Sequence, residues 1–141
     1  MYLAPRKGVH AGFRRSILAV IAALVLTGCG REDEAIRQHR QAFESLGSTM
    51  AAIDEAWLAG HLSGTFTVTA LEQTLQLAEQ ERASLAASPE MLADPRGAQL
   101  SQSAERLSRL LAATIRDVRA ADAGAVRRHL ADNPLPPQGR S

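Results

Sequence analysis

The chain has 141 residues, the length of a single domain. Its one cysteine excludes an intramolecular disulfide and any zinc or iron–sulfur site built on several cysteines. The net charge of +1, from 16 basic and 15 acidic residues, argues against a nucleic-acid binder that acts through bulk electrostatics.

The first 28 residues have the organisation of a secretory signal peptide. Four basic residues and no acidic one precede a run of ten apolar residues, 17–26. As a helix this run spans about 15 Å, half of a hydrocarbon core of about 30 Å, so no transmembrane helix is expected. A basic start followed by a short apolar run is typical of a secretory signal that is removed from the mature protein.

The apolar run ends in the motif Leu26-Thr27-Gly28-Cys29. This motif resembles the lipobox of bacterial lipoprotein precursors, and the resemblance covers only this N-terminal segment. It implies that the Cys29 thiol is diacylated and that the chain is cut between Gly28 and Cys29. Two or three acyl chains, at about 0.8 kcal/mol per buried CH₂, would anchor the protein stably to a membrane. The alternative is an ordinary signal peptide that happens to contain a cysteine.

The residue after Cys29 bears on the membrane that receives the protein. Gly30 stands there, with no Asp at that position. By resemblance to lipoproteins of bacteria with two membranes, this favours the outer membrane over the inner one. We therefore expect a lipoprotein on the periplasmic face of the outer membrane.

The mature part, residues 29–141, is poor in large apolar residues and rich in alanine. Removal of the signal takes away four basic residues, so 12 basic residues face 15 acidic ones and the net charge becomes −3. Alanine is the best helix former, and it lets helices approach closely. The composition predicts an all-α protein with a thin core, which a partner or a second copy could help to stabilise.

The first helix is predicted over residues 32–59, with Gly60 as its C-cap. One apolar stripe runs along it at three- and four-residue intervals, and the stripe also includes His39. The apolar members of the stripe are Ile36, Phe43, Leu46, Met50, Ile53 and Trp57.

The second helix is predicted to end near Ala87, and two starts compete. Thr69 begins a capping box with Glu72, whereas Ser63 is a rival N-cap. The β-branched run over residues 65–69 has strand character, but a strand here would have no partner, so helix or loop is favoured. The predicted core stripe comprises Val68, Leu71, Leu75, Ala78 and Leu85.

Two Pro-containing caps separate the second helix from the third. Ser88 and Asp94 each precede a proline, which predicts a single helical turn followed by a helix over residues 95–121. Asp122 then caps a short fourth helix that carries Val126 and Leu130. The predicted stripe of the third helix comprises Leu100, Leu107, Leu110, Leu111, Thr114 and Val118.

These elements predict an antiparallel up-down-up bundle of three long helices with a short fourth helix, over residues 29–131. The Pro-rich segment 132–141 is expected to be a disordered tail. Beyond the lipobox, the pattern is similar only in general character to small helical envelope lipoproteins.

Charge is divided unevenly along the mature chain. Residues 29–95 carry 4 basic and 11 acidic residues, whereas residues 96–141 carry 8 and 4. One interpretation is a basic face that binds lipid headgroups, cell-wall polymers or an acidic protein. The other is a basic helix packed beside acidic ones, with local pairs such as Glu105 with Arg109. The candidate face comprises Arg106, Arg109, Arg116, Arg119, Arg127 and Arg128.

Trp57 and Phe66 flank the first turn as the aromatic cluster of the mature chain. They form either a docking tip for a partner or the cap of the core at that end. The histidines at 39, 61 and 129 lack the spacing of a metal motif. His39 is either a ligand or pH-sensitive core residue, or the solvated end of its stripe.

No glycine-rich elbow, phosphate loop or His/Asp cluster surrounds the serines and threonines, so we expect neither an enzyme nor a cofactor or metal site. The expected function is a lipid-anchored helical interaction or scaffold module, with an envelope protein or a second copy as partner. The alternative is a binder of an anionic ligand through the arginine face.

Overall fold

The computed structural model describes the backbone of residues 10–133 and the side chains of residues 30–133. The expectations for cleavage and lipidation at Gly28 and Cys29 concern side chains outside this range. The segment 134–141 also lies outside it. Throughout the described residues the regular structure is helical, without a strand, so the all-α prediction is confirmed.

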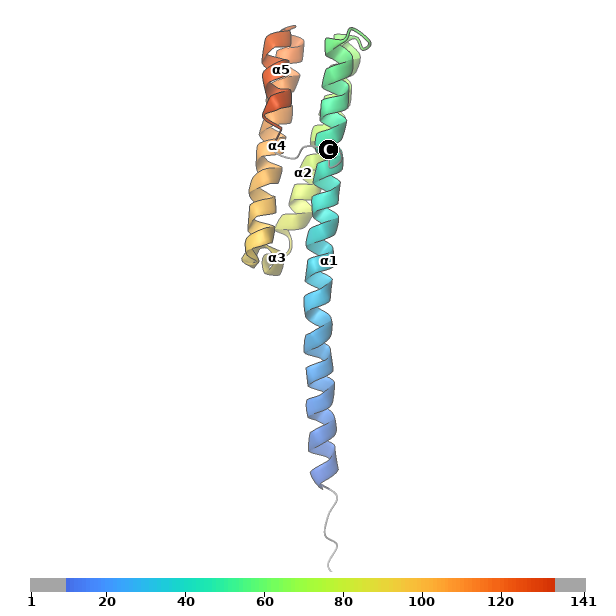
Figure 1. Ribbon diagram of the computed structural model, residues 1–141, viewed down its shortest axis with the longest axis vertical. Helices are drawn as coiled ribbons and strands as arrows, with labels where there is room; N and C mark the ends of the chain where they lie inside the picture. The colour runs from blue at the N-terminus through green and yellow to red at the C-terminus, as the bar shows by residue number, and fades with distance from the viewer. Residues whose placement is uncertain (1–9, 134–141) are drawn as a thin grey trace, which may run out of the picture. The chain divides into compact units, whose positions relative to one another are not determined.

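Five helices follow one another along the chain (Figure 1). They are α1 (His10–Leu58), α2 (Gly64–Ala86), α3 (Pro89–Ala93), α4 (Pro95–Arg119) and α5 (Ala123–Ala131). The chain divides into two compact units, residues 1–35 and 36–141. The described part of the first unit is the beginning of α1, and the second unit holds the remainder of the described chain.

The first helix begins earlier than its sequence pattern predicts, at His10 rather than near residue 32. The apolar run and the segment after it contain no proline, and isolated glycines such as Gly30 lower helix stability by only about 1 kcal/mol each. No local signal therefore interrupts the helix across residues 26–29.

The turn after α1 confirms Gly60 as a helix terminator. Gly60 has a φ of +75°, in the left-handed region. Its N–H bonds the carbonyl of Trp57, and the N–H of His61 bonds the carbonyl of Ala56. These two bonds form a Schellman motif, which satisfies carbonyls that the end of the helix leaves unpaired.

The second helix begins at the earlier of its two candidate caps. The Ser63 hydroxyl accepts a hydrogen bond from the N–H of Phe66 at 3.3 Å, and Thr69 lies inside the helix. The β-branched run is therefore helical. The hydroxyls of Thr67 and Thr69 donate to carbonyls four residues earlier, which lets threonine fit a helix.

The remaining helices begin at the predicted caps. The carboxylates of Asp94 and Asp122 accept hydrogen bonds from backbone N–H groups in the first turns of α4 and α5. Ser88 caps α3 without a side-chain hydrogen bond. Helix α4 ends at Arg119, two residues before the predicted end, because Ala121 turns the chain with a φ of 55°.

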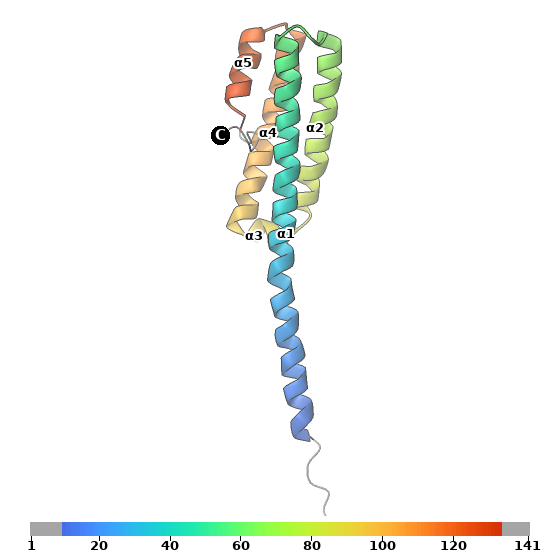
Figure 2. The ribbon, with the colours of Figure 1, turned by 45° about the vertical axis from the view of Figure 1, so that its right-hand side comes forward.

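Within the second unit, α4 packs against α2, α3 and α5 (Figures 1 and 2). Most predicted stripe positions are buried. The half-buried ones are Leu46, Ile53, Trp57, Val68, Leu75 and Leu110. The large apolar side chains with no exposed surface are Phe43, Met50, Leu71, Leu85, Leu107, Leu111 and Val126.

The short α3 is held tightly against the start of α4. A Cβ atom added at Gly97 would lie 1.8 Å from the carbonyl oxygen of Met91. Only glycine allows this approach of the two backbones. Sequence patterns did not single out Gly97, because its requirement comes from a neighbouring element.

The residues directly after α5 are hydrogen-bonded to α1. The Asn133 side-chain amide donates to the carbonyl of Gly47 at 3.1 Å, and Asp132 forms the C-cap of α5. The ordered chain thus includes the first two residues of the segment that we expected to be a disordered tail.

Candidate functional site

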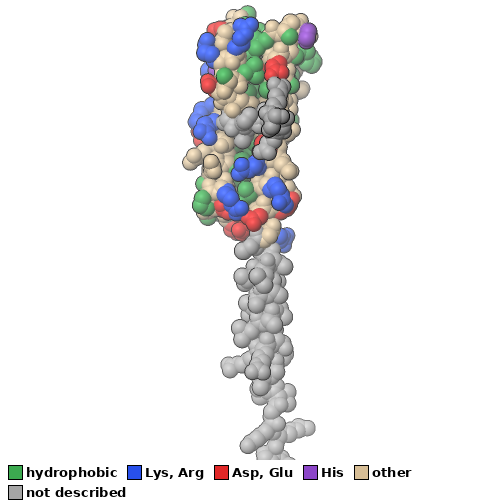
Figure 3. All heavy atoms as spheres, in the orientation of Figure 1, with side chains coloured by type: hydrophobic (Ala, Val, Ile, Leu, Met, Phe, Trp, Pro, Cys, Tyr) green, Lys and Arg blue, Asp and Glu red, His purple; other side chains and the backbone are tan. Residues whose placement is uncertain are grey.

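The six arginines of the candidate basic face are all exposed, four on α4 and two on α5. Arg109 pairs with Glu105 one helical turn away, at 2.5 Å, and Arg119 crosses to Glu72 of α2. Arg106 donates to the hydroxyl of Ser103 at 3.1 Å. In the view of Figure 3 the basic side chains are scattered rather than gathered in one patch. The anion-binding alternative stays a prediction.

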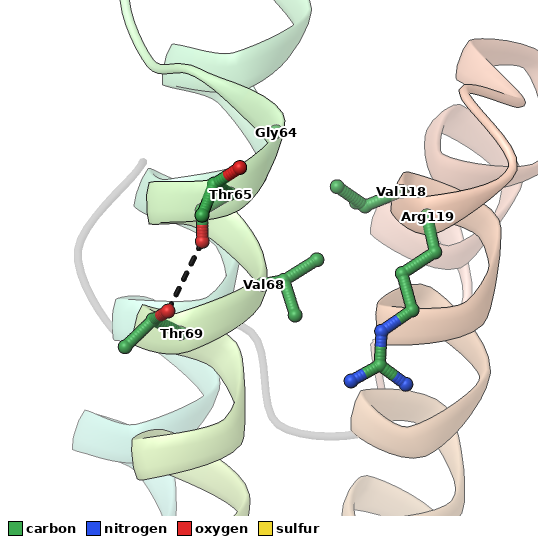
Figure 4. A pocket seen from close by; sticks show the side chains of 6 residues that line it. All are labelled: Gly64, Thr65, Val68, Thr69, Val118 and Arg119. Atoms are coloured by element: carbon green, nitrogen blue, oxygen red, sulfur yellow. Dashed lines mark hydrogen bonds between the residues drawn. The ribbon is translucent and has the colours of Figure 1, made fainter.

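A shallow hollow of about 430 Å³ lies where the start of α2 meets the end of α4 (Figure 4). Val68 and Val118 point toward each other across it. The Thr69 hydroxyl donates to the carbonyl of Thr65 at 3.1 Å, and the Arg119 guanidinium is engaged by Glu72. The charged group of this hollow therefore already has a partner within the protein.

A second hollow, of about 380 Å³, lies farther along the interface between α2 and α4. Its two arginines are also paired, Arg82 with Glu79 at 2.6 Å and Arg109 with Glu105. The hydrogen bond from Arg82 lowers the pKa of the Glu79 carboxyl. Neither hollow presents an unpaired charge to a ligand.

The two aromatic residues at the first turn differ in their surroundings. Trp57 is half-buried, and its indole nitrogen lies beside the start of α2, 4.0 Å from where a Cβ atom on Gly64 would stand. Phe66 is 59% exposed. It therefore contributes little to the core, and its exposure is what a docking residue requires.

The most unusual side chain of the second unit is Asp54, which sequence reasoning missed. It has no exposed surface, and neither carboxylate oxygen has a hydrogen-bond partner. Burial raises its pKa from 3.8 to about 7. One signal was present in the sequence: Asp54 stands four residues after Met50, on the same stripe.

Two histidines form pairs between helices. Nδ1 of His39 lies 2.6 Å from the Glu81 carboxylate, which joins α1 to α2, and this side chain of His39 is only 14% exposed. Nε2 of His129 lies 2.7 Å from the Asp117 carboxylate, which joins α5 to α4. His61, in contrast, is exposed in the turn after α1. The stripe position of His39 is thus half-buried, with a carboxylate partner.

The described side chains include no group of three His, Cys, Asp or Glu residues that could hold a metal ion. Among the described residues, no helix combines the length and the apolar character that a membrane span requires. Comparison with protein-family models, with curated proteins and with solved structures finds no match to this chain.

Proposed function

We propose that the protein is a lipid-anchored envelope lipoprotein, whose helices act as an interaction or scaffold module on the periplasmic face of the outer membrane. The observation that carries this proposal is the position of the single cysteine. Cys29 is the last residue of a lipobox and directly follows a basic segment and an apolar run of signal-peptide length. Acylation there would supply the membrane anchor.

The anchor is tested by expressing the full chain in a two-membrane bacterium with labelled palmitate. The wild-type chain should incorporate the label, lose its signal peptide and sediment with membranes, whereas Cys29→Ser should lose the label and remain unprocessed. Gly30→Asp is the matched control, since it should keep the label and move the protein from the outer to the inner membrane. Unchanged labelling of Cys29→Ser would disprove the proposal.

The proposed module is an antiparallel up-down-up bundle in which α1 from residue 36 onward, α2 and α4 are the long helices. Two contacts between side chains of different helices support this arrangement. His39 lies early in that part of α1 and pairs with Glu81, late in α2, whereas Glu72 lies early in α2 and pairs with Arg119, at the end of α4. Distances between spin labels placed at the ends of the three helices would test the arrangement.

A further inference from the structure

Asp54 stands out because its carboxyl group is buried without any partner. Among the described side chains it is the only carboxyl group with no exposed surface and with both oxygens free of hydrogen bonds. An ionised carboxylate is very costly to bury without hydrogen bonds, and a neutral carboxyl costs far less. The folded structure therefore favours the form of Asp54 that carries a proton.

The short helix α5 lies level with Asp54. Helices α1 and α5 run in opposite directions (Figures 1 and 2), and the Asn133 amide, just after α5, donates to the carbonyl of Gly47 in α1. Asp54 lies seven residues after Gly47, about 10 Å along α1 and on the same side of it. The fully buried Val126 lies seven residues before Asn133. Asp54 therefore lies on the side of α1 that α5 covers.

Asp54 has no charged partner in the elements around it. Burial is the only cause of its raised pKa, so no ionised group of the described residues contributes to that shift. His129 of α5 and Asp117 of α4 are half-buried and contact each other. The remaining titratable and charged residues near this level are exposed: Glu55, His61, Glu72, Arg116, Arg119, Asp122, Arg127, Arg128 and Asp132.

Helix α5 is the covering element whose release costs least. It has nine residues, of which only Ala125 and Val126 are buried, whereas α4 buries nine residues along its length. A helix this short is marginal in water by itself, and elements with few buried apolar contacts open before the rest of a protein. The turn before it also holds Ala121 in the left-handed region, which is unfavourable for a residue with a Cβ.

One of the contacts that hold α5 also depends on protonation. Nε2 of His129 lies 2.7 Å from the carboxylate of Asp117 in α4. An imidazole is positively charged only when it is protonated, so this contact is an ion pair in acid and a weaker, neutral hydrogen bond in base. A rise in pH therefore acts on Asp54 and on His129 in the same direction, against the packing of α5.

We infer that α5 is a pH-sensitive element, which packs over Asp54 while that carboxyl is protonated and separates from the other helices when it ionises. In the open form the carboxylate reaches water, so opening releases a proton and a rise in pH favours opening. The pKa of about 7 in the closed form, against 3.8 for an exposed aspartate, has the sign that this requires. The inference concerns conformation alone and does not rest on the lipid anchor.

Hydrogen exchange of the full chain at pH 5.5 and pH 8, followed by mass spectrometry, tests this inference. Protection factors of the α5 amides, corrected for the intrinsic exchange rate at each pH, should fall about tenfold or more from pH 5.5 to pH 8. They should also stay below those of the centre of α4 at both pH values, as local opening requires. The amides of α3, at the other end of this unit (Figures 1 and 2), should keep their protection.

Two results of this experiment would overturn the inference. Protection of α5 that does not change with pH would show that its opening leaves Asp54 buried. Equal protection of α5 and of the centre of α4 would show that the helices open together, so that α5 is not a separate element.

Substitutions assign the pH dependence to Asp54. Asp54→Asn should remove the fall in α5 protection, since the amide does not titrate, and Asp54→Leu should do the same if the Asn variant does not fold. Glu55→Gln is the matched control at the neighbouring exposed position and should keep the fall. Helical circular dichroism identifies the folded variants. A fall that persists without the Asp54 carboxyl but disappears in His129→Gln would assign the effect to His129 and overturn the inference.

Discussion

His39 and Glu81 join the first and second helices through a 2.6 Å contact between Nδ1 and a carboxylate oxygen. The two residues lie 42 positions apart in the chain, and both are largely shielded from solvent. A hydrogen bond in such a setting resists competition from water better than an exposed one. The pair therefore helps to hold α2 against α1.

Removal of this contact should destabilise the protein. We expect His39→Ala to lower the free energy of unfolding by about 1–2 kcal/mol, because Glu81 loses its partner. Urea denaturation measures the change. His61→Ala, in the exposed turn, should have almost no effect. If a double-mutant cycle with Glu81→Gln showed no coupling, the contact would contribute nothing to stability.

The buried carboxyl of Asp54 should make stability depend on pH near neutrality. Its pKa is about 7 in the folded protein and near 3.8 when exposed, so the folded state binds the proton more tightly. The contribution of Asp54 to the free energy of unfolding is greatest below pH 4. It falls as the pH rises from 4 to 7, in total by about 4 kcal/mol. Asp54→Asn should remove this part of the pH dependence.

Urea denaturation at pH 5 and pH 8 tests that expectation. The free energy of unfolding of Asp54→Asn, compared with that of the wild type at the same pH, should be higher at pH 8 than at pH 5. Asp54→Leu should also be more stable than the wild type at pH 8, because it replaces an unpartnered buried carboxylate with an apolar group. Parallel pH profiles for wild type and Asp54→Asn would show that Asp54 does not titrate in this range.

Two helix ends use the same motif with different residues. After α4, Ala121 has a φ of 55°, and its N–H bonds the carbonyl of Val118, as Gly60 bonds that of Trp57 after α1. The left-handed conformation costs a residue with a Cβ about 1 kcal/mol. Ala121→Gly should therefore raise the melting temperature, and Gly60→Ala should lower it. If both substitutions shifted the melting temperature in the same direction, the left-handed conformation would not be what determines the effect at these two positions.

The close approach at Gly97 predicts the largest effect of a single methyl group. In Gly97→Ala the new Cβ would overlap the backbone of Met91, so α3 must move, at a cost of about 3 kcal/mol. At Gly124 in α5 the nearest atom to an added Cβ is 3.4 Å away, and Gly124→Ala should be neutral or slightly stabilising. Thermal unfolding of the two variants provides the comparison.

The anion-binding alternative makes its own prediction. Arg116, Arg127 and Arg128 are exposed, and their combined replacement by Gln should weaken binding of the purified Cys29→Ser chain to vesicles of anionic lipid. Such binding should also fall steeply between low and physiological salt. Replacement of Arg109, which pairs with Glu105, is the matched control. Binding that is absent or insensitive to salt would eliminate the alternative.

The sequence alone determined where most of the described helices begin or end, and which side of each helix faces the core. The caps at Gly60, Asp94 and Asp122 could be predicted because capping depends on a few neighbouring residues. The apolar stripes containing Phe43 and Leu107 could be predicted because helical periodicity is also a local property.

Tertiary structure decided the properties that depend on which helix lies opposite. The burial of Asp54, the partner of His39 and the close approach at Gly97 all come from contacts between elements far apart in the chain. Phe66 has the apolar character of a core residue, yet the packing of α2 leaves it exposed. Local propensity specifies a helix and its amphipathic pattern, whereas the environment of each side chain follows only when the helices pack together.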